Sequence, residues 1–379
     1  MSSQDLDARP GWVCLALFAA LGGCGSGAAV SDRDASADSD APGSDSSSAD
    51  VSGADSNPIP PPPGPYPRPT YATLSETGLF AEAVTQRITE DALPFEPTYW
   101  LWSDGADKRR WLRLPPGTRI DTTAMDHWSF PIGTKLWKEF SLGGVLLETR
   151  LIERYGDGPE DYWMGAFVWN AEQTDAVLAP DGHTDINGTP HDAPAQKDCL
   201  ACHRGEAGRV LGFSAMQLSR ADDDSRVGPT LTDIIRRNLL SAPPDAGSTP
   251  PFSVPGDQVT AAALGYLHAN CGHCHNRNGT AWPDTQMVLR VTTQDTDVES
   301  SDLYLSLVGR PLQYWRGGAI TKRVFPGDPD ASAIVARMSA RGNEDQMPPL
   351  ATEENDPTGI AKVRAWIAAL PSAAAHAER

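Results

Sequence analysis

The sequence predicts an α+β protein in which an antiparallel β-rich N-terminal region precedes an α-helical C-terminal region. Between about residues 93 and 180, short apolar–polar alternations are separated by Pro and Gly, which is typical of strands joined by turns. After residue 258, apolar residues recur at helical spacing. Residues 1–70 differ from both regions, because an apolar start is followed by an acidic, proline-rich stretch.

Residues 1–23 are predicted to be a signal peptide of the lipoprotein type. The apolar run 11–21 is shorter than the roughly 20 residues that span a bilayer. Leu21-Gly22-Gly23-Cys24 is typical of a lipoprotein cleavage box, so we expect a lipid anchor at Cys24. An ordinary signal peptide is the alternative, and Asp5 and Asp7 are unusual in a positive n-region. We therefore expect an exported lipoprotein at the periplasmic face of a bacterial membrane or at the outer membrane.

Residues 24–70 are expected to form a disordered acidic and Pro-rich tether. Ser, Asp, Ala and Gly dominate 31–56, and Pro dominates 58–69. Such a segment cannot bury enough apolar surface to offset its ordering entropy. The whole chain has a formal charge of −19, which repels phosphate backbones, so we expect no nucleic-acid partner.

Residues 71–195 are predicted to form the β-rich domain. Alternating segments at 110–114, 134–140, 145–153 and 162–169 predict strands of an antiparallel sheet or small sandwich. A short helix is predicted near 75–83, although Gly78 weakens it. His127 is expected to be structural, because no catalytic set surrounds it in the sequence.

Two Cys-x-x-Cys-His motifs carry the strongest chemical signal: Cys199-Leu200-Ala201-Cys202-His203 and Cys271-Gly272-His273-Cys274-His275. Six cysteines and eight histidines placed at random would produce roughly 0.002 such motifs. The spacing lets two thiols attach to the two vinyl groups of one porphyrin, while the adjacent histidine ligates the iron. We therefore predict two covalently bound haem c groups.

Zinc and redox thiols are the alternative uses of these cysteines. A zinc site built from all four thiols would leave both histidines unexplained, and its cysteine pairs would lie far apart for a zinc ribbon. A redox Cys-x-x-Cys motif needs a βαβ setting that the sequence does not predict.

Residues 258–372 are predicted to form a cytochrome c-like domain that holds the second haem. Helices are expected at 258–270, 329–338 and 359–370, and a close helix crossing is expected at Gly265. Met347 lies in a Pro-rich loop between the last two helices, so we predict it as the distal ligand of this iron, with Met338 as the alternative.

Residues 196–257 form the first haem-binding segment, which is too short for a core of its own. One amphipathic helix is expected at 230–240, and the haem is expected to pack against the β-rich region or the second haem domain. Met216 is the predicted distal ligand. His183, His191, His268 and an open sixth position are alternatives.

Further short motifs occur in order between residue 71 and the C-terminus: Leu74-Ser75-Glu76-Thr77-Gly78-Leu79-Phe80, Phe130-Pro131-Ile132-Gly133-Thr134, Glu148-Thr149-Arg150-Leu151, Trp169-Asn170, Pro326-Gly327-Asp328-Pro329 and Gln346-Met347-Pro348-Pro349. With the two haem motifs, this ordered set resembles a family of bacterial dihaem c-type cytochromes. The resemblance implies two haems and electron transfer, and it implies no substrate.

The function predicted from the sequence is electron transfer in the bacterial cell envelope, with a redox protein as partner. His203 and His275 are the expected proximal iron ligands. One alternative is a dihaem redox enzyme, peroxidase-like, with one open iron. Another is a partner- or carbohydrate-binding module fused to a cytochrome.

Overall fold

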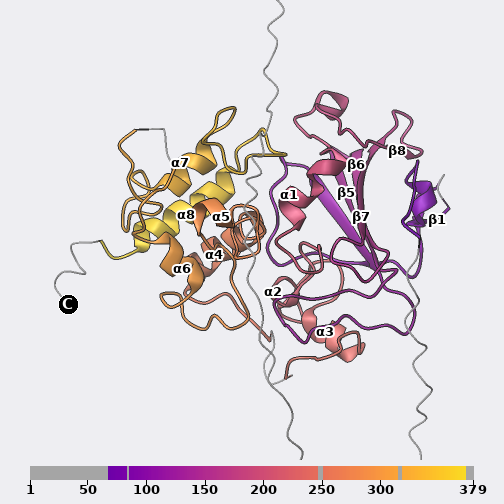
Figure 1. Ribbon diagram of the computed structural model, residues 1–379, viewed down its shortest axis with the longest axis horizontal. Coiled ribbons are helices and arrows are strands. Elements are labelled where there is room, and N and C mark those ends of the chain that lie inside the picture. The colour runs from indigo at the N-terminus through magenta and orange to yellow at the C-terminus, as the bar shows by residue number, and fades with distance from the viewer. Residues whose placement is uncertain (1–66, 83–84, 246–250, 315–317, 373–379) are drawn as a thin grey trace, which may run out of the picture. The chain divides into compact units, whose positions relative to one another are not determined.

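The computed structural model describes residues 67–82, 85–245, 251–314 and 318–372 (Figure 1). All of them belong to one compact unit, Asn57–Arg379. The predicted signal peptide, the lipid anchor at Cys24 and nearly all of the tether lie outside the described residues. No helix in the described ranges combines the length and apolar composition needed to cross a bilayer.

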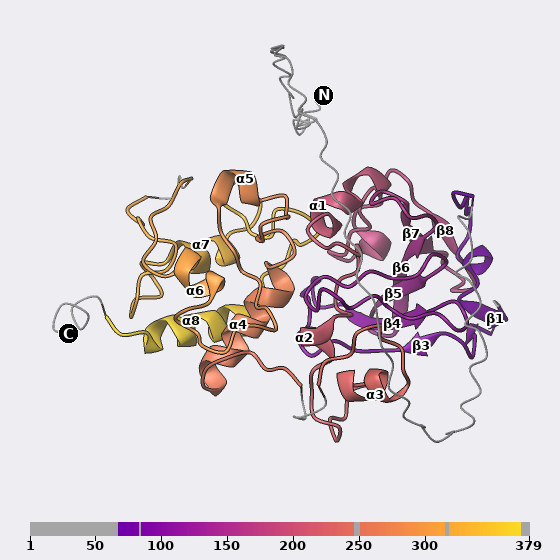
Figure 2. The same ribbon diagram turned by 60° about the horizontal axis from the view of Figure 1, so that its bottom comes forward.

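An antiparallel sheet forms the N-terminal part, and its strands follow one another in chain order (Figure 2). A two-stranded hairpin of β1 and β2 precedes it. The predicted short helix is only the 3₁₀ turn Ser75–Thr77, because Gly78 adopts a left-handed conformation and ends it. The strands are β1 Phe80–Glu82, β2 Arg87–Ile88, β3 Leu93–Pro94, β4 Asp107–Arg113, β5 Lys135–Leu142, β6 Val145–Arg154, β7 Tyr162–Trp169 and β8 Ala176–Leu178.

The two faces of this sheet have different environments because side chains alternate along each strand. Trp111, Trp137 and Leu151 are opposite one another on neighbouring strands and belong to one apolar core. The other face carries the charged residues that bear on the site below. This antiparallel sheet, together with the helices that follow it, confirms the α+β prediction.

Helices occupy the rest of the described chain. They are α1 Cys199–His203, α2 Ala215–Leu218, α3 Leu231–Arg236, α4 Gln258–Asn270, α5 Trp282–Thr285, α6 Asp302–Leu307, α7 Ala333–Ser339 and α8 Pro357–Ala369, with short 3₁₀ turns at Ile186–Gly188 and Gln196–Asp198. Thr230 caps α3 in a capping box with Asp233. Asp257 and Asp356 cap α4 and α8 through their carboxylates.

The segment between the sheet and α4 shares a core with the sheet. Phe213 lies at the centre of an aromatic cluster with Phe95, Trp128 and Phe130. Leu231 and Ile234 of α3 are fully buried in the same cluster. Because this segment has too few apolar residues for an independent core, it folds against the β-rich region.

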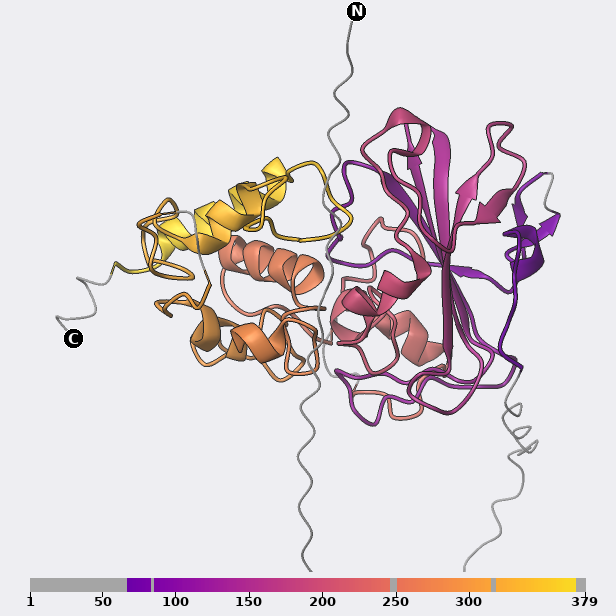
Figure 3. The same cartoon turned by 45° about the horizontal axis from the view of Figure 1, so that its top comes forward.

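Helices α4 and α8 lie side by side in the C-terminal part (Figure 3). The sequence predicts a close crossing at Gly265, but the structure shows it at Gly359 of α8. A Cβ at Gly359 would lie 2.1 Å from the Tyr266 ring of α4. Gly265 instead faces Tyr99, whose ring would lie 2.0 Å from an added Cβ. The prediction of a glycine crossing was right for this helix pair and wrong for the residue.

Candidate cofactor site

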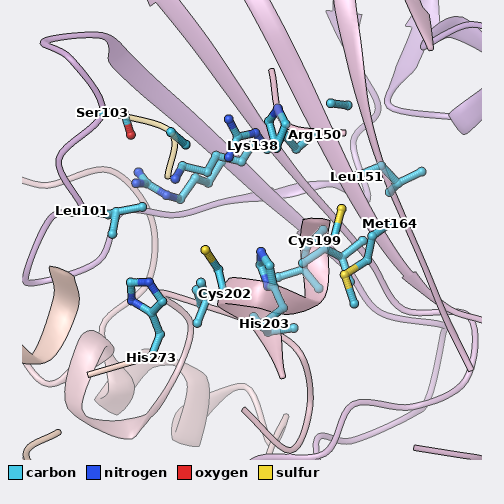
Figure 4. A pocket seen from close by; sticks show the side chains of 18 of the residues that line it. Leu101, Ser103, Lys138, Arg150, Leu151, Met164, Cys199, Cys202, His203 and His273 are labelled. Carbon is cyan, nitrogen blue, oxygen red and sulfur yellow. The ribbon is translucent and has the colours of Figure 1, made fainter. Parts of the chain in front are cut away.

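The first Cys-x-x-Cys-His motif forms α1. Cys199 and Cys202 are three residues apart, so both thiols lie on one face of this short helix. Both line a cavity of about 1190 Å³ of empty space, partly open to solvent, between α1 and the sheet. Figure 4 shows Cys202, His203 and His273 on its wall, with Lys138 and Arg150 across from them. Burial raises the pKa of Cys199 to about 11.

The His203 ring is oriented by one strong hydrogen bond. Its Nδ1 lies 2.6 Å from the backbone oxygen of Arg209. Since a carbonyl can only accept, Nδ1 carries the proton and the lone pair of Nε2 is left for a ligand. Burial lowers the pKa of His203 to about 4, so the ring is neutral at pH 7. A neutral imidazole held in this way is what metal ligation requires.

The second motif begins where α4 ends. The His275 amide donates to the Cys271 oxygen at 2.9 Å, so the motif continues as a helical turn. Its thiols and His275 line a second cavity of about 1500 Å³ of empty space, also partly open. His275 Nδ1 has a weaker contact, at 3.4 Å, with Thr285 Oγ1. Burial lowers the pKa of His275 to about 4. The two motifs therefore present the same chemical groups to two separate cavities.

The predicted distal ligands fall in different places. Met347 and its alternative Met338 both line the second cavity, as His275 does. Met216 does not line either cavity; it is 3% exposed and packs in the apolar core of the C-terminal helices. Its place in that core rather than on the first cavity could not be inferred from the sequence spacing.

The histidines that were alternatives for the distal ligand lie in different environments. His183 is exposed, and Nδ1 of His268 accepts a hydrogen bond from the Val291 amide at 3.1 Å. His191 does line the first cavity, but its Nε2 lies 2.9 Å from Glu148.

The sequence analysis did not predict a row of three basic side chains that crosses the sheet. Arg110 is opposite Lys138, and Lys138 is opposite Arg150, so the row crosses β4, β5 and β6. All three line the first cavity. Arg150 is paired with Glu148 at 2.6 Å. Neither Arg110 nor Lys138 forms an ion pair within the described ranges, and the buried Nη1 of Arg110 has no hydrogen-bond partner there.

This row is electrostatically unfavourable as it stands. Like charges placed opposite one another destabilise a sheet. Burial lowers the pKa of Arg110 to about 10 and lowers that of Lys138 well below its usual value. The first cavity is therefore suited to an occupant with negative charge. In the sequence the only signal was the alternation of basic residues on neighbouring strands, and their pairing depends on register.

Comparisons with protein-family models, with curated proteins and with solved structures give no match.

Proposed function

We propose that this protein is a dihaem c-type cytochrome that transfers electrons in the bacterial cell envelope. The observation that carries the proposal is that each Cys-x-x-Cys-His motif lines its own large cavity with two thiols and a neutral histidine. Cys199, Cys202 and His203 would hold one haem. Cys271, Cys274 and His275 would hold the other.

The residues of the first cavity fit such a group. A haem carries two propionates, and Arg110 and Lys138 are two buried basic side chains on this cavity for which the described residues show no ion pair. Attachment needs no oxidant, because each thiol adds across a vinyl double bond, with the sulfur bonding to one carbon and the proton going to the other. The thioethers would then fix the group, and the two basic side chains would neutralise its carboxylates.

The second cavity supports a cytochrome c-like arrangement of the C-terminal region. The motif follows α4 directly, α8 packs against α4, and Met347 lines the cavity from the loop between α7 and α8. Met347 would supply a thioether ligand to the iron held by His275, and such a ligand would raise the iron's potential relative to two histidines. The bound haems would supply one-electron redox chemistry, while the chain orients them and limits solvent access.

A pyridine haemochrome assay on protein matured in a host with c-type cytochrome assembly tests the proposal. We expect two covalent haems per chain. Cys199→Ala/Cys202→Ala and Cys271→Ala/Cys274→Ala should each retain one. Colourless protein, or pigment extracted by acidified acetone, would refute it. Zinc at one equivalent in such protein would point to Cys202, His273 and Cys274, whose ligand atoms lie within 4.8 Å of one another.

A peroxidase-like dihaem enzyme is the second candidate. The observation in its favour is the buried His191–Glu148 pair on the first cavity beside Arg150, since such groups can move protons and stabilise charge. EPR and optical spectra distinguish the two functions. A high-spin haem that responds to peroxide or cyanide would support the enzyme, and two low-spin haems inert to both would support the electron carrier.

A further inference from the structure

The two motifs lie against each other, although they are about seventy residues apart in the sequence. The sulfurs of Cys202 and Cys274 and a ring nitrogen of His273 lie within 4.8 Å of one another. Thr280 Oγ1 donates to the Ala201 oxygen at 2.9 Å, and the Cys274 thiol contacts the same oxygen at 3.5 Å. The carbonyl inside the first motif is thus a hydrogen-bond acceptor for the second motif and the loop after it.

The backbones of the two motif regions come close together at a glycine. A Cβ at Gly205, just after the first motif, would lie 2.2 Å from the backbone oxygen of His273. Real Cβ atoms do not come so close to a carbonyl, so only glycine leaves room for the second motif here. The ion pair of Arg290 with Glu206, at 2.7 Å and largely buried, holds the two loops together beside it.

His273 occupies the contact itself. It is 9% exposed and lines both cavities, and Figure 4 shows it beside Cys202. Its buried Nδ1 has no hydrogen-bond partner among the described residues. Trp102 and Pro348 also line both cavities, whereas Cys202 lines only the first and Cys274 only the second.

We propose that Cys202 and Cys274 hold the two haems edge to edge, so that they exchange electrons directly and act as one redox unit. This inference rests on the proposed function. In a c-type haem one carbon atom separates the sulfur from the ring. Two rings attached to sulfurs within 4.8 Å of each other therefore come within about 11 Å, taking bonds of about 1.5 Å or slightly more.

Such a pair would pass electrons without a mediator. An electron leaving one ferrous iron would oxidise it to the ferric state and would reduce the other, ferric iron to the ferrous state. Donor and acceptor for the net reaction are redox proteins outside the chain. A partner therefore needs access to one cavity only, and the electron can reach the other haem through the Cys202–Cys274 contact.

Visible circular dichroism of the full-length holoprotein tests this arrangement. Two porphyrins at such a distance couple their Soret transitions, so we expect a two-signed Soret band in the wild type. The single-haem variants Cys199→Ala/Cys202→Ala and Cys271→Ala/Cys274→Ala should each lose it. A wild-type spectrum equal to the sum of the two single-haem spectra would overturn the inference and leave the proposed function intact.

A glycine pair provides a matched perturbation. Gly205→Val introduces a clash with His273 of the second motif, and we expect it to reduce the coupling amplitude at least twofold while two haems remain. Gly208→Val is the control, because its Cβ would lie 2.4 Å from the Trp128 oxygen, on the β-rich side. Equal reductions in both variants would contradict the arrangement. Fewer than two haems in the wild type would overturn this inference and the proposed function together.

Discussion

Arg110→Met should change the stability of this protein in opposite directions with and without the first haem. Arg110 is 5% exposed, and burial lowers its pKa from 12.5 to about 10. A shift of this size corresponds to a penalty of about 3 kcal/mol on the charged form in the folded chain. The folded pKa is the lower one, so the penalty applies at every pH below about 10. It is relieved only as the pH rises from 10 towards 12.5.

Comparing Arg110→Met in protein without the first haem and in protein with it separates the cost of burying the cation from the stabilisation that it would give to a propionate. In Cys199→Ala/Cys202→Ala protein, Arg110→Met removes a buried cation whose desolvation is only partly offset by Glu96 and the Trp100 ring, so the free energy of unfolding should rise by up to about 3 kcal/mol. In protein that carries the two proposed haems, the same change would remove a partner of a propionate, and the free energy of unfolding should fall by about 1–3 kcal/mol.

Urea unfolding followed by far-ultraviolet circular dichroism measures both values. Arg87→Met, at an exposed position on β2, is the control and should stay within about 0.5 kcal/mol in both backgrounds. If Arg110→Met shifts the free energy of unfolding by the same sign and amount in both backgrounds, the assignment of the cation row to the haem carboxylates is refuted.

Three further predictions concern the C-terminal region. The unfolded pKa of His268 is about 6.5 and burial lowers the folded pKa to about 3, so stability should fall by about 1 kcal/mol per pH unit as the pH drops from 6.5 towards 3. His268→Asn keeps an acceptor for the Val291 amide and should flatten this profile in urea titrations. Met347→Ala should make the second haem high-spin by EPR and lower its midpoint potential, whereas unchanged spectra would exclude Met347 as a ligand. Gly359→Ala should lower the free energy of unfolding by about 1–3 kcal/mol, because the added Cβ overlaps the Tyr266 ring, and a neutral effect in urea unfolding would mean that this crossing can relax.

Elements that depend on local pattern were predictable from the sequence. The helix expected at 258–270 is α4 Gln258–Asn270, because its apolar spacing and the Asp257 cap are both local. The strands near 134–140, 145–153 and 162–169 appear as β5, β6 and β7, because alternation encodes a half-buried sheet. The sequence also identified the two thiol–histidine motifs, because their chemistry is set by spacing along a few residues.

The contents of each cavity depended on tertiary structure. Met216 and Met347 are both predicted distal ligands, yet of the two only Met347 lines one of the two cavities, because packing decides which way a side chain points. Arg110 and Lys138 meet only through strand register, which a one-residue slip would reverse.

What the sequence predicted and what it did not differ in how far apart along the chain the interacting residues lie. Periodicity, capping and motif spacing act over a few residues, so the amino-acid sequence alone determined the α+β class, the main helices and strands, and the candidate haem ligands. The approach of Cys202 to Cys274, the cation row and the glycine at the helix crossing join residues far apart in the chain. Only the folded packing decides such contacts, because many chain paths satisfy the same local pattern.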